Sequence, residues 1–258
     1  MGENTEGVVG EAVTAGPGAA STGTVVHGVD LSVDAHVHTG FAAGRDSIGV
    51  IVMAADRAGL SGVTFADQVG PDTAWLPAYA DAIRRAQQRT EMRLRVAAEV
   101  EVVQQDGWLA WPADLGDLEA VSVAVSRLPL AGGVIGPREV RTMLVAGMLD
   151  AAEVAEIVVG TTINGLLRAT RYAPAQLARP LSLLSQVGID DAQLTPGLFA
   201  ALADACRTTN TTVEVSEAWR SPSARLIRMF RDAGVSLVAA SDARYADEVG
   251  RWQYVHTV

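Results

Sequence analysis

The feature that most constrains the fold is a regular alternation of strand-like and helix-like segments, which begins at Leu31 and continues to the C-terminus. The strand-like segments are short and rich in Val and Ala, and most are followed by apolar residues at helical spacing. Repeated βα units imply a parallel sheet. The predicted strands cover 31–38, 62–68, 94–103, 118–125, 212–217 and 235–240, with a short strand around Arg179.

The predicted helices connect these strands and give about seven βα units in the last 230 residues. This number favours an α/β fold of the distorted (β/α)7 TIM-like barrel type. An open doubly wound sheet is the alternative, but no glycine-rich phosphate fingerprint follows the first strand, which weakens its dinucleotide-binding version. The predicted helices cover 46–59, 75–89, 137–172 with a break near Asp150, 196–208, and a segment from Ser221-Pro222 to Gly234.

The N-terminal segment differs in composition from the rest of the chain. It is rich in Gly, Ala, Thr and Glu and has no apolar periodicity. We therefore expect residues 1–28 to form a flexible arm and 29–258 to form one barrel domain. A start-site artefact is an equally good interpretation of the first 23 residues.

Composition excludes several classes of function. The net charge of −10 and the absence of a basic run argue against a nucleic-acid partner. All 20 basic residues are Arg, which excludes a Schiff-base lysine and a Walker A lysine. Cys206 is the single cysteine, so no internal disulfide can form. With no apolar run of membrane-spanning length and no signal-peptide pattern, we expect a cytoplasmic bacterial protein without a membrane partner.

Two of the four histidines lie close together in the first strand, in the run Asp34-Ala35-His36-Val37-His38. Side chains two residues apart on a strand point to the same face, so His36 and His38 project together near the strand's C-terminal end. In a parallel barrel that end carries the active site. Paired imidazoles at this position predict a Zn, Mn or Fe site. The alternative is a pair of core histidines satisfied by hydrogen bonds.

Carboxylates occur in several other predicted strands, most of them at strand ends. A lone strand-end carboxylate is usually a helix cap or a salt-bridge partner. Several that converge on an HxH pair are more than this explanation predicts, and they favour a metal site. They are Asp67, Glu99, Glu101, Glu214 and Asp242.

These motifs together resemble those of the PHP family, whose name stands for polymerase and histidinol phosphatase. The resemblance rests on DAHVHT at 34–39, AAEVEV around Glu99 and the closing SDAR, and it covers about 31–251. Its most specific stretch is VEVSEAWRSPSARLIRMFRDAGVSLVAASDA. The resemblance implies a distorted (β/α)7 barrel with a metal centre at its C-terminal mouth. Most members of this family are phosphoesterases.

The resemblance also implies which residues bind metal. The family's first metal takes the two HxH histidines, a bridging Glu and the Asp of SDAH, which correspond here to His36, His38, Glu99 and Asp242. The histidines that serve the family's other two metals are replaced in this chain. One divalent ion, Zn, Mn or Fe, is therefore the implied cofactor. The replacements are Gln68 after Asp67, Ser126-Arg127, Arg179 before Pro180, and Arg244.

The arginines at these replaced positions predict an anion site. Arg179 and Arg244 keep positive charge where the family has metal, and a guanidinium binds carboxylate or phosphate bidentately. Arg220 and Gln68 are further candidates for substrate binding. A salt bridge to a neighbouring strand-end acid is the alternative for each arginine. Asp67 and Glu217 are the candidate catalytic acid or base.

We therefore expect a mononuclear metal-dependent enzyme that acts on a small anionic metabolite. Hydrolysis of a phosphoester-like bond is the default reaction, and divergence to lyase or cyclase chemistry is an open possibility. The alternative is a catalytically inactive PHP-like protein that binds a metabolite or a partner. A trinuclear phosphatase needs histidines that this chain lacks. Metal identity, substrate and oligomeric state stay open.

Overall fold

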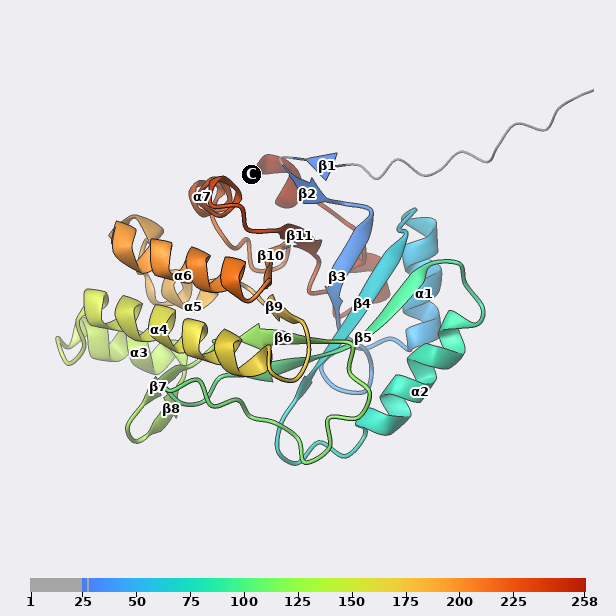
Figure 1. The fold of residues 1–258 in the computed structure, drawn as a ribbon, viewed down its shortest axis with the longest axis horizontal. Helices are drawn as coiled ribbons and strands as arrows, with labels where there is room; N and C mark the ends of the chain where they lie inside the picture. The colour runs from blue at the N-terminus through green and yellow to red at the C-terminus, as the bar shows by residue number, and fades with distance from the viewer. Residues whose placement is uncertain (1–24, 27) are drawn as a thin grey trace, which may run out of the picture.

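The computed structural model describes residues 25–26 and 28–258, and its centre is one curled sheet (Figure 1). The strand order is β1-β2-β11-β10-β9-β6-β5-β4-β3. All neighbouring strands pair in parallel except β1 and β2. The strands are β1 Val25–Val26, β2 Val29–Asp30, β3 Val33–Val37, β4 Gly62–Val69, β5 Arg93–Glu101, β6 Ala120–Ala124, β9 Ala175–Leu177, β10 Thr212–Ser216 and β11 Leu237–Ala240.

The curl of the sheet brings the end of β3 beside the segment that follows β11. Val37 forms a parallel bridge with Ala243. The His38 N–H donates to the Ala243 carbonyl at 2.9 Å, and the Asp242 N–H donates to the His36 carbonyl at 2.9 Å. Seven parallel strands, from β3 around to β11, therefore enclose one interior. This arrangement confirms the predicted distorted (β/α)7 barrel over the open doubly wound sheet.

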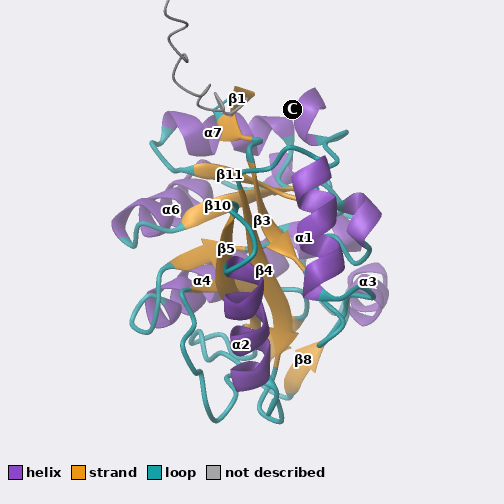
Figure 2. Cartoon of the chain, turned by 90° about the vertical axis from the view of Figure 1, so that its right-hand side faces the viewer, coloured by secondary structure: helices purple, strands orange, loops and turns teal. Residues whose placement is uncertain are grey.

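The helices lie outside the strands, as Figure 2 shows. In Figure 1, α1 and α2 lie on the right beside β4 and β5, and α3 to α6 stack on the left. Asp150 caps α4 by accepting from the backbone N–H groups of Ala152 and Glu153, which explains the predicted break there. The helices are α1 Ile48–Arg57, α2 Leu76–Gln87, α3 Pro137–Val145, α4 Ala151–Ala169, α5 Ser182–Val187, α6 Pro196–Thr208 and α7 Ala224–Asp232.

Three local features differ from the sequence-based expectation. A hairpin of β7 (Leu128–Leu130) and β8 (Gly133–Ile135) follows β6. The strand expected around Arg179 ends at Leu177, because Arg179 and Leu181 have φ values of 44° and 59° and the short helix α5 follows. Helix α7 begins after Ser223, whose side chain accepts from the Leu226 N–H, and not directly after Ser221.

Close packing holds the helices on the sheet. The buried core consists mainly of Val, Leu, Ile and Ala side chains. Gly165 of α4 permits a close approach, since a Cβ there would lie 2.6 Å from a Val102 methyl group. No helix among the described residues is both long and apolar enough to cross a membrane. The predicted arm 1–28 lies mostly outside the described residues, although its segment Val25–Val26 pairs with β2.

Candidate metal centre

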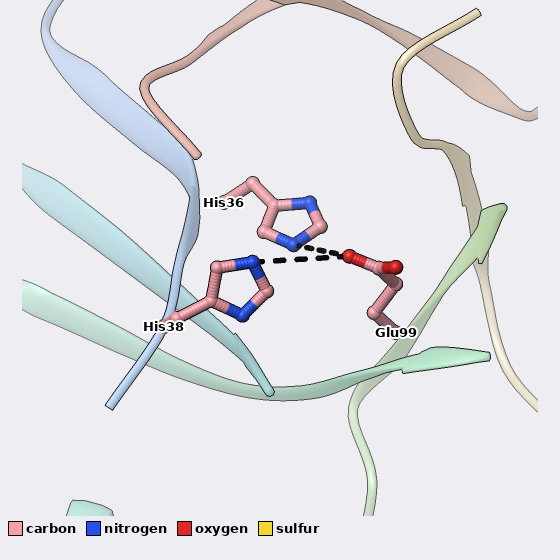
Figure 3. Close-up of side chains that lie close together, drawn as sticks. All are labelled: His36, His38 and Glu99. Atoms are coloured by element: carbon pink, nitrogen blue, oxygen red, sulfur yellow. Dashed lines mark ion pairs between the residues drawn. The ribbon is translucent and has the colours of Figure 1, made fainter. Parts of the chain in front are cut away.

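His36 in β3 and His38, directly after this strand, lie in the mouth of the barrel, where both are fully buried. Their ring centroids are 4.9 Å apart. Both Nε2 atoms face the same carboxylate oxygen, Glu99 Oε2, at 3.1 Å from His36 and 3.9 Å from His38 (Figure 3). One ligand atom from each of the three residues lies within 4.8 Å of the other two. The fold therefore brings together three of the four predicted metal ligands around one point.

Asp242 joins this cluster from the opposite end of the sequence. It follows β11, has a φ of 54° and is buried. Its Oδ1 lies 2.9 Å from His38 Nε2. All four predicted ligands therefore meet at the C-terminal ends of β3, β5 and β11.

Arg179 extends into the same cluster and is only 3% exposed. Its Nη2 and Nη1 donate to the two oxygens of Glu99 at 2.5 and 2.9 Å, and Nη1 lies 3.4 Å from Asp242 Oδ2. The structure thus shows the salt bridge that was the alternative interpretation of this arginine. We call His36, His38, Glu99, Arg179 and Asp242 the centre.

Trp219 covers the arginine and was not predicted as a site residue. Its Nε1 donates to Asp242 Oδ2 at 2.6 Å. The Arg179 guanidinium carbon lies 5.2 Å from the centroid of the indole ring, a cation–π distance. The only sequence signal for this residue is its position three residues after the end of β10.

Glu214 and Gln176 orient His36 from below the mouth. Glu214 Oε1 is hydrogen-bonded to His36 Nδ1 at 2.7 Å, and Gln176 Nε2 donates to the same oxygen at 2.6 Å. The Arg179 backbone N–H donates to the other oxygen at 3.2 Å. Sequence reasoning noted Glu214 as a strand carboxylate but assigned it no role. Here it fixes the ring so that Nε2 faces Glu99, as outer-shell carboxylates do in metal sites.

The charges in the centre shift one another's pKa values. Burial alone would raise the pKa of Glu99, but Arg179 and His36 hold it well below its ordinary value. Burial alone would also raise the pKa of Asp242, and His38, His36 and Arg179 lower it. Burial would lower the pKa of His36, yet the Glu214 and Glu99 carboxylates raise it well above its ordinary value. The centre thus holds its carboxylates in the charged form, paired with Arg179 and the histidines.

The donor set fits a divalent metal ion. His36 Nε2 is buried and makes no hydrogen bond within the described part of the chain. Two imidazole nitrogens and a carboxylate oxygen are ligands that Zn, Mn and Fe accept. The site can therefore hold a metal, in competition with protons on the histidines.

The two predicted acid or base residues have different surroundings. Asp67 is buried, accepts from Thr39 N–H at 2.9 Å and Thr39 Oγ1 at 2.5 Å, and has Oδ1 3.7 Å from His38 Nδ1. Glu217 accepts from the backbone N–H groups of Tyr254 and Val255 at 2.8 and 3.1 Å. Asp67 therefore adjoins the centre, whereas Glu217 binds the C-terminal segment.

The remaining predicted substrate-binding residues are exposed, and we call Gln68, Arg220 and Arg244 the rim. Gln68 Nε2 donates to Glu99 Oε1 at 3.2 Å. Arg220 lines a cavity of about 350 Å³ next to Pro180 and Leu181. Arg244 is fixed through its backbone, whose N–H donates to Glu248 Oε2 at 2.8 Å. The rim therefore includes one residue in direct contact with the centre and two solvent-exposed cations.

Ser126 and Arg127, where the resemblance predicted a replaced histidine, contact Glu101. The backbone N–H groups of both residues donate to Glu101 Oε1, at 2.8 and 3.0 Å. The hydroxyl of Ser126 donates to the other oxygen. Glu101 is thus satisfied by neutral donors of the β6–β7 connection and stands apart from the centre.

Comparison with known proteins gives a match in structure alone. No family model and no curated protein matches the sequence. A histidinol phosphate phosphatase from Lactococcus lactis, crystallised with zinc, L-histidinol and phosphate, matches with a TM-score of 0.60 and 13% identity over 87% of this chain and 89% of that one. A protein from Listeria monocytogenes, described as a histidinol phosphatase, matches with a TM-score of 0.62 and 12% identity over 85% and 97%.

These matches span nearly the whole barrel, and their low identity limits them to the fold. They agree with the motifs of the first and last strands, which indicated the same architecture. The chain therefore has the fold of PHP-type histidinol phosphatases, with a partial metal-ligand cluster at the mouth of its barrel.

Proposed function

We propose that this protein is a metal-dependent enzyme of the PHP type that acts on a small anionic metabolite through one divalent ion. The observation that carries the proposal is the convergence of His36 Nε2, His38 Nε2 and Glu99 Oε2 at one buried point. Hydrolysis of a phosphoester is the default reaction. The structural relative from Lactococcus lactis, whose crystals contain zinc and phosphate, supports this choice.

A single ion is proposed because the remaining positions carry other groups. Arg179, which pairs with Glu99 and Asp242, stands where the resemblance implies a metal-binding histidine, and a guanidinium cannot bind a metal ion. Gln68 and Ser126 supply weaker ligands than the histidines implied by the resemblance. A lyase or cyclase reaction, in which one ion polarises the substrate, is compatible with the same set.

Each residue has a proposed part in the reaction. A bound ion would polarise a phosphoryl oxygen or activate water. Glu214 holds the His36 ring in its ligating orientation. Asp67, within 4 Å of His38, is the first candidate for the acid or base, and Glu217 is the second. The anion-binding groups are Arg179, Arg220, Arg244 and Gln68.

The second candidate function is a catalytically inactive PHP-like protein that binds a metabolite or a partner. One observation favours it. The bidentate pair of Arg179 and Glu99 neutralises a metal ligand without any ion. The two candidates differ in whether the histidines bind metal and support turnover.

Metal counting on reconstituted protein separates the two. We expect about one equivalent of Zn, Mn or Fe, together with hydrolysis of small phosphomonoesters. Glu99→Gln, His36→Ala and His38→Ala should each abolish both. Glu101→Gln is the matched control on the same strand and should keep both, since the Glu101 carboxylate is hydrogen-bonded to Ser126 and Arg127 and to none of the proposed ligands. Less than about half an equivalent in the wild type argues against the proposal.

A further inference from the structure

Arg179 and a metal ion would need the same carboxylate oxygens. Glu99 Oε2 lies 2.9 Å from Arg179 Nη1 and 3.1 Å from His36 Nε2. Asp242 presents Oδ1 to His38 and Oδ2 to Arg179. A divalent ion coordinated by His36, His38 and Glu99 would therefore stand beside a permanently charged guanidinium, and like charges repel strongly in a buried site.

The surroundings of Arg179 hold its guanidinium against the ring of Trp219 and leave a cavity beside the residues that follow it. Its guanidinium is stacked near Trp219, which itself bonds Asp242. Its backbone has a φ of 44° and that of Leu181 a φ of 59°, both in the left-handed region that is costly for these residue types. A cavity of about 350 Å³ is lined by Pro180 and Leu181, which follow Arg179, and by Arg220 and Ser221.

We infer that Arg179 is exchanged between two anionic partners: the guanidinium pairs with Glu99 and Asp242 in the metal-free protein, and metal displaces it so that it binds the substrate anion. The inference rests on the proposed function for the existence of the metal site. It makes Arg179 a substrate-binding residue only in the metal-loaded protein. Because binding free energies are linked, metal and anion then each raise the other's affinity through this residue.

The first experiment measures metal affinity by competition with a chelator, with no turnover involved. Arg179→Gln removes the competing charge and should bind Zn²⁺ or Mn²⁺ about tenfold or more tightly than the wild type. Arg168→Gln, which removes a surface arginine paired with Asp106, is the matched control and should leave the affinity unchanged. Equal or weaker metal binding by Arg179→Gln overturns the inference.

The second experiment measures the binding of inorganic phosphate by titration calorimetry, with and without metal. Arg179→Gln should weaken phosphate binding about tenfold in the metal-loaded protein and leave it unchanged in the metal-free protein. A loss of the same size in both states would show that the guanidinium is always available. No loss in either state would show that it never binds the anion. Both results contradict the exchange.

A third measurement needs no change at Arg179, in case that variant fails to fold. Metal titration of the wild type should change tryptophan emission, because the guanidinium leaves the Trp219 ring. Trp219→Phe should lack this change and keep the emission of the other four tryptophans. An identical response in both proteins overturns the inference. If neither the wild type nor Arg179→Gln binds metal, the proposed function is wrong as well. If both bind metal with the same affinity, only the inferred exchange of Arg179 is wrong.

Discussion

The centre and the rim both contain an arginine that follows a barrel strand, and the two have opposite surroundings. Arg179 is 3% exposed and bonded to two carboxylates, whereas Arg244 is exposed and held through its backbone. The sequence assigned them the same role. The difference shows that a position after a strand predicts where an arginine side chain lies along the barrel. It does not predict which anionic group that side chain binds.

Burial decides how strongly each arginine contributes to the stability of the fold. A charge pair deep in the barrel interacts at low effective dielectric, and removal of one partner leaves the other charge uncompensated. An exposed guanidinium is screened by water and salt. Substitutions in the centre should therefore change the free energy of unfolding strongly, and substitutions at the rim should change it weakly.

The largest effect is expected at Arg179. Arg179→Ala leaves Glu99 and Asp242 without their shared cation and should lower the free energy of unfolding by about 3–5 kcal/mol. Arg244→Ala, its counterpart at the rim, should change that free energy by less than about 0.5 kcal/mol. Urea denaturation of the metal-free proteins measures both. Equal losses of unfolding free energy at the two positions would show that burial does not distinguish the centre from the rim.

A smaller effect, dependent on pH, is expected from Asp34 beneath the centre. Its carboxylate accepts from the backbone N–H groups of Ser241 and Gly250, and burial raises its pKa from 3.8 to about 6 despite these bonds. A raised folded-state pKa contributes stability below pH 4 that is lost as the pH rises through 6, on the order of 3 kcal/mol in total.

Asp34→Asn tests this pH dependence, because the amide cannot ionise. The variant should lose about 1 kcal/mol at all pH values through the Gly250 bond. Its stability relative to the wild type should then improve between pH 4 and pH 7. Denaturation of both proteins across this range gives the difference, in which the other titrating groups largely cancel. A flat difference would show that Asp34 keeps an ordinary pKa.

A small loss of stability is expected at Glu217. Glu217→Gln weakens the bonds to the Tyr254 and Val255 backbone and should cost about 1 kcal/mol in urea denaturation. Its metal affinity should equal that of the wild type, since its carboxylate faces the C-terminal segment. A tenfold weaker metal affinity of Glu217→Gln would show that Glu217 contributes to the centre.

The barrel was predictable because its strands and helices carry local signals. Thr195-Pro196 predicted the start of α6, and Asp150 the break between α3 and α4, since caps act within a single turn. The hairpin of β7 and β8 was missed despite the turn signal Gly132-Gly133, because strands of three residues are too short to show an alternating pattern. The left-handed backbone of Arg179 and Leu181 was also missed, because tertiary contacts impose it on residues that do not favour it.

The site was predictable to the extent that it depends on strand register. The spacing of two residues predicted that His36 in β3 and His38 just after it project together, and the family resemblance supplied Glu99 and Asp242. The roles of Glu214 and Trp219 depend on side-chain distances between strands far apart in sequence. The salt bridge of Arg179 depends on the same distances, and no local pattern encodes them.

The contact between β3 and the segment after β11 has a consequence for biosynthesis. His36 emerges from the ribosome about 200 residues before Asp242, whose backbone N–H it receives. Until that late segment arrives, the two imidazoles have no fourth ligand and Asp34 lacks the Ser241 and Gly250 donors. A nascent or truncated chain without this segment would hold the two imidazoles and Glu99 but lack Asp242, so the proposed metal site is completed only late in synthesis.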